Sequence, residues 1–337
     1  MAQFRWLLLA VLIARITFAE NTTLCPLAVG DRFSATDTLA CGDEHDPDAK
    51  QCLAGLAWAP TKFEVVLEPA QAGCGDFLVR FPSARPIGDP LNDTVAMEWF
   101  APHGDDDKIR SARAIVVVHE SASHMTVGRL IARGISGQGL HAFLIQLPGY
   151  GARRSPSPPK AEQILPSLLQ AVADVRRARD AVAALPLIDH SLIGVEGTSL
   201  GGFVTATVAG LDHGYDRIFI ALAGGDIQDV ILNGARDAAK AHAKLNAAGV
   251  SDDQIKAVSH EIEPLRLARR IEPEKTWLYN GKLDTVVSPR NSLALATAAH
   301  LAEEHHIEFP TDHYGGIVYL PQVIDQIMQR MAESPSK

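Results

Sequence analysis

The sequence predicts an α/β fold, in which a mostly parallel central sheet carries helices on both faces and a short disulfide-rich extension precedes it. From residue 114 onward, apolar runs of strand length alternate with segments of helical periodicity. Continuous apolar runs are typical of parallel strands buried on both faces, and the alternation predicts strand–helix–strand units. The four cysteines all lie between residues 25 and 74, which sets the N-terminal part apart from the rest.

The composition is that of a globular protein with enough apolar side chains for a large core. The chain has 337 residues, of which 47% are hydrophobic and 21% are charged. Its formal net charge is −9, and the sequence contains no long basic run. These features argue against a nucleic-acid partner, while the acidic surface favours solubility.

Residues 1–19 resemble a signal peptide. Arg5 supplies a positive charge, residues 6–13 are apolar, and Thr-Phe-Ala at 17–19 is a plausible cleavage site. Arg15 interrupts the apolar stretch, which is short for a bilayer span, although an uncleaved membrane anchor is the alternative. We therefore expect a secreted or periplasmic protein without stable membrane insertion once the signal is cleaved.

Residues 20–62 are rich in Asp, Ala, Thr, Gly and Cys and predict a loop-rich extension. An even number of cysteines in an exported chain favours two disulfides. Three pairings are possible among Cys25, Cys41, Cys52 and Cys74, and the sequence does not choose between them. Free or metal-binding thiols are the alternative, but the spacings contain no C-x-x-C pair, which disfavours a zinc site.

A single domain is expected over residues 63–337. Short β-like runs at 63–67, 77–81 and 94–100 suit an antiparallel meander at one edge of the sheet. The later strands are expected at 114–119, 141–147, 192–196, 217–223 and 276–280, and the helices at 126–137, 161–185 and 199–210 and from 289 and about 315.

Two of the helical segments carry further expectations. The long helix at 161–185 is expected to hold Leu, Val and Ala inside and to expose its Arg and Asp side chains to water. The polar helical stretch at 226–273 is a possible small cap over the site. Within it, Ser251 and Gln254 fit a capping box at a helix start.

The most informative motif is Gly197-Thr198-Ser199-Leu200-Gly201, which has the pattern G-x-S-x-G. A buried strand precedes it and a helix of small residues follows. In that context the serine lies on a sharp, strained turn, and the flanking glycines remove side chains that would collide there. The pattern alone is common, but its strand–turn–helix context favours Ser199 as a nucleophile over a buried serine in an ordinary glycine-rich turn.

A serine nucleophile needs a base, and the base needs an orienting carboxylate. Asp284 follows the expected strand at 276–280, and His313 follows a short strand-like run at 307–309. Both positions are carboxyl ends of strands, where open parallel sheets build their sites. Asp226 is a second candidate acid, whereas Asp312 is poorly placed to orient the ring of its own neighbour.

Other histidines bunch near the C-terminus without a metal-binding pattern. His300, His305 and His306 are expected on a helix or at its end and in contact with solvent. No matching set of acidic or cysteine ligands surrounds them, so we expect no metal site there.

The residues from about 94 to the end resemble the α/β-hydrolase superfamily. The matching pieces are residues 116–119, residues 147–151, the Ser199 turn, residues 281–287 and the His313 loop. Within the superfamily the chain is similar to bacterial esterases and to prolyl-peptidase-like or dienelactone-hydrolase-like members. The resemblance implies the α/β-hydrolase fold and hydrolysis of an ester, thioester or amide through an acyl-enzyme. It implies a small-molecule or polymer substrate, foremost an ester, with no metal and no organic cofactor.

One segment departs from the pattern of the superfamily. Relatives commonly carry His-Gly after the third strand, whereas this chain has His119-Glu120-Ser121-Ala122. A carboxylate aimed at a developing oxyanion would oppose it, so we expect Glu120 to point away. The amides of Ser121 and Leu200 are then the candidate oxyanion hole. A role for Glu120 in selecting the substrate is the alternative.

The candidate substrate pocket consists of five side chains: Glu120, His124, Met125, Tyr150 and Tyr314. Two other functions remain open. Serine peptidases of this fold usually add a propeller or a large cap, for which the N-terminal part is short. The second alternative is a binding protein that keeps the fold without catalysis. It remains open because Glu120 stands where the superfamily commonly has glycine.

Overall fold

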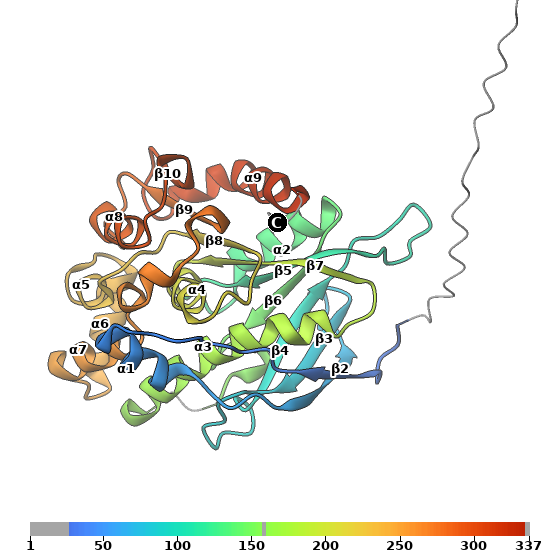
Figure 1. Cartoon of the computed structure of the whole chain (residues 1–337), viewed down its shortest axis with the longest axis horizontal. Coiled ribbons are helices and arrows are strands. Elements are labelled where there is room, and N and C mark those ends of the chain that lie inside the picture. Colours follow the sequence, from blue (N-terminus) through green and yellow to red (C-terminus); the bar gives the residue numbers. More distant parts are fainter. Residues whose placement is uncertain (1–26, 157–159, 334–337) are drawn as a thin grey trace, which may run out of the picture.

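The computed structural model describes residues 27–156 and 160–333, so the expected signal peptide and Cys25 lie outside the described residues. A ten-stranded sheet has the order β1-β2-β3-β4-β6-β5-β7-β8-β9-β10 (Figure 1). The strands are β1 (Arg32–Thr36), β2 (Lys62–Pro69), β3 (Phe77–Pro82), β4 (Thr94–Phe100), β5 (Ala112–Val118), β6 (His141–Gln146), β7 (Ile188–Thr198), β8 (Arg217–Ala221), β9 (Thr276–Gly281) and β10 (His306–Phe309). The α-helices are α1 (Pro47–Leu56), α2 (Thr126–Gly137), α3 (Ala161–Ala183), α4 (Leu200–Leu211), α5 (Ile227–Asn233), α6 (Asp237–Ala247), α7 (Asp252–Glu261), α8 (Pro289–Ala298) and α9 (Leu320–Ala332).

The sheet has an antiparallel part and a parallel part. Strands β1 to β4 pair antiparallel with one another, and β4 pairs antiparallel with β6. From β6 through β5, β7, β8 and β9 to β10, every pairing is parallel. The mostly parallel sheet and its antiparallel edge, both predicted from the sequence, are confirmed. Parallel strands place their carboxyl ends at one edge, where the loops that follow them meet.

Helices cover both faces of the sheet, because successive strand residues point to opposite sides. Val116 and Val118 of β5 face one core with α1, α3, α4 and α8, whereas Ile115 and Val117 face a second core with α2 and α9. Every residue from Ala114 to Val118 is fully buried. This explains why the sequence of β5 is apolar without alternation.

The N-terminal part of the chain differs from the loop-rich extension that its composition predicts. Arg32–Thr36 forms β1, which pairs with β2 and becomes the edge strand of the central sheet. Pro47–Leu56 forms α1, which begins with Asp46 as its N-cap and Pro47 in its first turn. Ala49, Cys52, Leu53 and Leu56 of α1 are buried in the main core. The segment therefore packs as part of the domain.

The structure also corrects the expectation of two disulfides. Cys41, Cys52 and Cys74 are free thiols. Two bridges among four cysteines would need at least one bond between these three. Cys52 is buried in α1, whereas Cys74 lies in the turn between β2 and β3. Burial raises the pKa of Cys52 to about 11, so this thiol behaves as a small apolar side chain.

Ion pairs hold the N-terminal segment in place of the expected disulfides. From α3, Arg177 Nε donates to Asp37 Oδ1 at 2.8 Å, and a second guanidinium nitrogen donates to the other carboxylate oxygen of Asp37. Asp180 accepts from the backbone and hydroxyl of Thr38 at 2.8 and 2.7 Å. Further along the segment, Arg270 reaches Glu44 at 2.9 Å. Positions 37–48 are thus fastened by charged side chains.

Helix α3 differs from its sequence prediction for the same reason. Its Arg and Asp side chains were expected in water, but Asp174, Arg176, Arg177 and Asp180 are all buried. The N-terminal segment covers this side of α3 and supplies partners for Arg177 and Asp180. Asp174 pairs with Arg153, and Arg176 pairs with Asp212, which follows α4, each at 2.6 Å. Helical periodicity distinguishes polar from apolar faces but cannot show that a distant segment covers the polar face.

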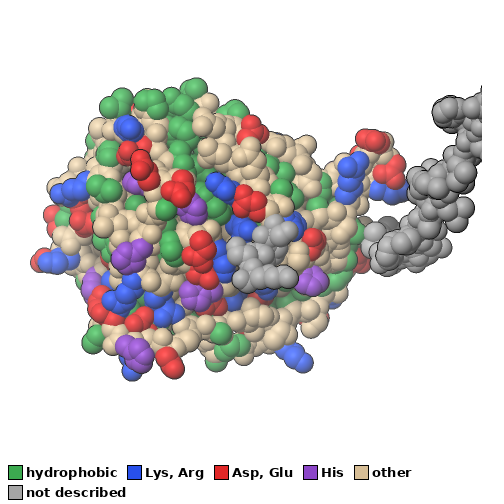
Figure 2. Space-filling view, turned by 45° about the horizontal axis from the view of Figure 1, so that its top comes forward, with side chains coloured by type: hydrophobic (Ala, Val, Ile, Leu, Met, Phe, Trp, Pro, Cys, Tyr) green, Lys and Arg blue, Asp and Glu red, His purple; other side chains and the backbone are tan. Residues whose placement is uncertain are grey.

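Helices α5, α6 and α7 occupy the stretch that the sequence marks as a possible cap. The predicted capping box is confirmed, since Ser251 Oγ accepts from the backbone of Gln254 and the Gln254 side chain accepts from the backbone of Ser251. Within the two described ranges, no helix is long and apolar enough to cross a membrane. On the face shown in Figure 2, acidic and basic side chains are interspersed.

We expect Asp37→Ala to lower the free energy of unfolding by about 3–5 kcal/mol, because it leaves the buried Arg177 guanidinium without its charge partner. Urea denaturation followed by circular dichroism measures the change. The control is Glu64→Ala, which removes an exposed partner of Arg32 and should cost less than about 1 kcal/mol. Equal, small effects of both substitutions would show that the buried pair does not hold the segment.

Candidate active site

Ser199 lies on the turn between β7 and α4, in a backbone conformation that residues other than glycine rarely adopt. Its φ is 54° and its ψ is −112°. A Cβ atom at Gly197 would collide with the backbone of Gly201, and one at Gly201 would collide with the carbonyl oxygen of Val118. The two glycines therefore let the turn pack tightly against itself and against β5. This is the strained strand-to-helix turn that raises a serine hydroxyl above the sheet.

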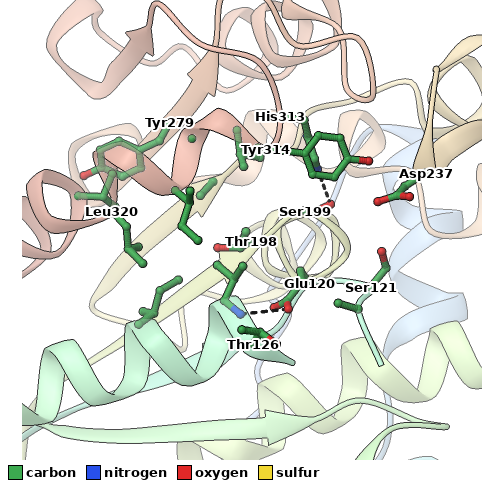
Figure 3. A pocket seen from close by; sticks show the side chains of 18 of the residues that line it. Glu120, Ser121, Thr126, Thr198, Ser199, Asp237, Tyr279, His313, Tyr314 and Leu320 are labelled. Carbon is green, nitrogen blue, oxygen red and sulfur yellow. Dashed lines mark hydrogen bonds between the residues drawn. The ribbon is translucent and has the colours of Figure 1, made fainter. Parts of the chain in front are cut away.

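The structure brings Ser199, His313 and Asp284 together in one hydrogen-bonded chain. Ser199 Oγ lies 3.1 Å from His313 Nε2, and His313 Nδ1 lies 2.7 Å from Asp284 Oδ2. A carboxylate can only accept, so Nδ1 carries the proton that it donates to Asp284. This leaves Nε2 of the neutral ring as the acceptor for the Ser199 hydroxyl. In Figure 3, the dashed line between Ser199 and His313 marks this hydrogen bond.

The loops after β9 and β10 fix the positions of Asp284 and His313 relative to each other. Asp284 is buried, and its Oδ1 accepts from the amides of Val286 and Val287 at 2.8 and 3.0 Å, which fixes the carboxylate. The Leu283 amide donates to the carbonyl oxygen of Thr311 at 2.9 Å and so joins the two loops. A Cβ atom at Gly281 would collide with that same carbonyl oxygen, so this close approach requires glycine.

The alternative candidates have other partners. Asp226 is exposed at the N-cap of α5, where its side chain accepts from the amide of Asp229 at 3.2 Å. Asp312 pairs with Arg236 at 3.2 Å and accepts from the amide of Gly315. His305 and His306 contact Pro273 and Asn280. In the described part of the chain, no group of three or more His, Cys, Asp and Glu side chains is arranged to hold a metal ion.

The unusual His119-Glu120 pair forms part of the framework around the site. Both oxygens of the Glu120 carboxylate accept from amides at the N-terminus of α2, Val127 and Gly128, at 3.1 Å each. His119 is fully buried, and its burial lowers the pKa to about 4, so the ring is neutral. Its Nδ1 donates to the Glu120 carbonyl oxygen and its Nε2 accepts from the amide of Leu147. The Glu120 carboxylate is thus committed to α2, whose N-terminal amides favour a negative charge.

The two amides expected to form an oxyanion hole belong to residues beside the serine. Leu200 is the first residue of α4, where backbone amides have no acceptor within the helix. Ser121 lines the same cavity as Ser199, and its carbonyl oxygen accepts from the Tyr150 hydroxyl at 3.1 Å. The oxyanion role of both amides stays a prediction.

A cavity of about 820 Å³ opens beside the Ser199 hydroxyl. The cavity lies at the carboxyl edge of the parallel strands. Its walls are formed by the loop after β5, helices α2, α6 and α9, the carboxyl-terminal parts of β7 to β10 and the His313 loop. Helix α6, which lies within the expected cap region, contributes Asp237, Lys240 and Lys244. In the view of Figure 3, Tyr279 and Leu320 lie on one side of Thr198, and Ser199, His313, Tyr314 and Asp237 lie on the other.

Three of the five expected pocket residues line this cavity: Glu120, Tyr150 and Tyr314. The structure places His124 and Met125 elsewhere. His124 is exposed, and Met125 is 1% exposed in the core beneath α2, where it adopts a left-handed conformation before the helix begins. The sequence could not distinguish these directions, because the loop turns sharply between Ser121 and Thr126.

Glu196 also lines the cavity, although no sequence motif points to it. It lies on β7 three residues before Ser199 and is 1% exposed. Its Oε1 accepts from the Thr198 hydroxyl at 2.6 Å, whereas its Oε2 has no hydrogen-bond partner among the described residues. Burial raises the pKa of Glu196 to about 8. A lone carboxyl in a strand expected to be buried on both faces was the signal that could have found it.

The raised pKa predicts how Glu196 affects stability. Between an unfolded pKa near 4.5 and a folded pKa of about 8, the unfolded state ionises while the folded state keeps its proton. The wild-type protein therefore loses stability as the pH rises through this window, and Glu196→Gln does not share that loss. The free energy of unfolding of Glu196→Gln, relative to that of the wild type, should therefore rise by up to about 1.4 kcal/mol per pH unit between pH 5 and pH 8, as measured by urea denaturation. If the free energies of unfolding of variant and wild type change in parallel with pH, the prediction is wrong. The control is Glu64→Gln, which changes an exposed carboxylate and should follow the wild type.

The part of the chain that contains this site is similar to a known protein family. Residues 169–316 match the model of the prolyl oligopeptidase family, a range that contains the serine, the acid and the histidine. Two uncharacterized proteins from two strains of Mycobacterium tuberculosis are each 27% identical over 184 residues. The match covers 52% of this chain and 43% of each relative, so the chain spans less than half the length of these curated relatives.

Solved structures share the fold over most of the chain. A puromycin-hydrolyzing peptidase of Mycobacterium tuberculosis has a TM-score of 0.57 and 15% identity, with 81% of this chain and 46% of that chain covered. An acetyl xylan esterase from Paenibacillus sp. R4 has a TM-score of 0.56 and 18% identity, with 87% and 95% covered. The chain therefore has the α/β-hydrolase fold, and residues 169–316 are similar to the prolyl oligopeptidase family.

Proposed function

We propose that the protein is a serine hydrolase that cleaves a carboxylic ester through an acyl-enzyme intermediate. The observation that carries the proposal is the continuous hydrogen-bonded chain from Ser199 Oγ through the His313 ring to Asp284. A serine hydroxyl is a weak nucleophile unless a base removes its proton, and this chain supplies that base and its orienting acid. The cavity beside the hydroxyl gives a substrate room to approach.

The mechanism follows from the direction of these hydrogen bonds. Ser199 Oγ attacks the carbonyl carbon while its proton passes to His313 Nε2, and Asp284 stabilises the imidazolium that forms. The imidazolium then gives its proton to the leaving alcohol, which departs and leaves an acyl-serine. Water attacks the acyl-serine by the same route, with His313 again as base, and releases the acid and the free serine.

The amides of Leu200 and Ser121 are proposed to stabilise the oxyanion. The Leu200 amide lies at the N-terminus of α4, where the helix dipole favours negative charge. The engagement of Glu120 by α2 supports this assignment, because the carboxylate is bound by two amides that neutralise part of its charge.

We expect Ser199→Ala to reduce the hydrolysis of short p-nitrophenyl esters by at least about a thousandfold, because the variant has no nucleophile. A fluorophosphonate probe should label the wild type and leave this variant unlabelled. The matched control is Asp226→Asn, which keeps the N-cap of α5 and should retain full turnover. Normal hydrolysis by Ser199→Ala would overturn the proposed nucleophile, and an unlabelled wild type would favour a non-catalytic binding protein.

A peptidase is the second candidate, favoured by the match of residues 169–316 to the prolyl oligopeptidase family. The same three residues would cleave an amide through the same acyl-enzyme, so the site alone does not separate the two substrate classes. Aminoacyl p-nitroanilides and p-nitrophenyl esters, compared by kcat/KM, separate them directly. Export of the protein stays a proposal that rests on the signal-like residues 1–19.

A further inference from the structure

The inner part of the cavity, between α2 and α9, is mostly apolar. Its walls are formed by the following side chains: Val127 and Ile131 of α2, Leu320 and Val323 of α9, Phe309 of β10 and Ala221 of β8. These side chains suit the hydrocarbon part of a substrate. Besides Thr198, whose hydroxyl donates to Glu196, two buried polar side chains interrupt this surface, Glu196 and Tyr279.

The strand register places these two polar groups on one face of the sheet. Thr198, Ala221 and Tyr279 are consecutive partners across β7, β8 and β9. Glu196 is two residues before Thr198 on the same strand, so the two side chains point to the same side. Ala221 lies between Thr198 and Tyr279, and its small side chain leaves the space over β8 open.

Each of the two groups has a polar atom without a partner. Among the described residues, neither Glu196 Oε2 nor the Tyr279 hydroxyl has a hydrogen bond. Buried polar atoms are nearly always paired in native proteins, and an unpaired one lowers stability. Two such atoms on the wall of one cavity, next to a candidate nucleophile, indicate that the molecule which enters the cavity supplies their partner.

The protonation of Glu196 decides which partner fits. Its pKa of about 8 keeps the carboxyl neutral at neutral pH. Because Oε1 accepts from Thr198, the proton belongs on Oε2, which then acts as a donor. The Tyr279 hydroxyl can donate or accept. A hydroxyl or a carboxamide, which accepts and donates at once, satisfies both groups.

We propose that the inner cavity is a substrate subsite that recognises a neutral hydroxyl or carboxamide on the substrate, with the Glu196 carboxyl and the Tyr279 hydroxyl as its partners. The subsite deepens the proposed hydrolase function and rests on it. Substrates would then be amphipathic esters, with a hydrocarbon stretch along α2 and α9 and a polar neutral group beyond it. Glu196 and Tyr279 are specificity residues here, because neither takes part in the proposed proton transfers.

The test compares matched pairs of p-nitrophenyl esters in a graded series of chain lengths. One member of each pair carries an ω-hydroxyl, and the other carries a methyl group in its place. In the wild type we expect one chain length at which the ratio of kcat/KM, hydroxyl over methyl, is greatest. In Glu196→Leu that ratio should fall by about ten- to a hundredfold, because the hydroxyl then lacks its partner.

Two further variants separate recognition from support of the Ser199 turn. Glu196→Gln keeps a neutral donor and acceptor and should retain most of the preference, whereas Tyr279→Phe should lose part of it. If Glu196→Leu instead slows both esters equally, Glu196 only braces Thr198 and the proposal is overturned. An ω-ammonium ester that the wild type prefers and Glu196→Gln loses would overturn the neutral-group assignment in favour of a cation.

Binding to Ser199→Ala separates failure of the subsite from failure of the proposed chemistry. Calorimetry with the methyl esters of the ω-hydroxy acid and of its methyl-ended counterpart needs no turnover. Preference for the hydroxyl ester in this variant, lost on adding Glu196→Leu, supports the subsite even if the wild type hydrolyses neither ester. Equal binding of both esters, with active wild-type enzyme, leaves the hydrolase proposal standing and rejects the subsite.

Discussion

The rest of the site depends on the strained backbone at Ser199. A φ of 54° at a residue with a side chain costs about 1–3 kcal/mol, so the surroundings must hold it. The Ser199 amide donates to the carbonyl oxygen of Ala221 at 2.8 Å, and the Phe203 amide donates to the carbonyl oxygen of Ser199 at 3.1 Å. Gly197 and Gly201 allow the close packing that no larger residue would permit. Together these contacts direct the hydroxyl toward His313.

The remaining parts of the site lie at the same edge of the sheet because the strands are parallel. Asp284 follows β9 and His313 follows β10, and the amide-to-carbonyl bond from Leu283 to Thr311 joins their loops. At the end of β5, the neutral His119 connects Glu120 with Leu147, the first residue after β6. The Glu120 carboxylate accepts from two amides at the start of α2 and so helps to position one wall of the cavity.

Buried ion pairs, and not the expected disulfides, attach the N-terminal segment to the rest of the domain. Arg176, Arg177 and Arg270 bind carboxylates and carbonyl groups from the segment 37–48 and from α4's end, with little exposure to solvent. Guanidinium groups suit this role, because they offer several donors in a fixed plane and stay charged when buried. The N-terminal segment is therefore integrated into the domain through interactions that a cysteine count does not predict.

The sequence by itself determined the mostly parallel sheet, the turn at Ser199 and the positions of Asp284 and His313 just after strands, because strand periodicity, glycine spacing and chain order can be read along the chain. Only the tertiary structure decided that β1 joins the sheet, that the charges of α3 are buried, and that Met125 enters the core while Glu196 lines the cavity. These outcomes depend on which distant segment covers a side chain. No local pattern encodes that, because burial results from packing between residues far apart in the chain.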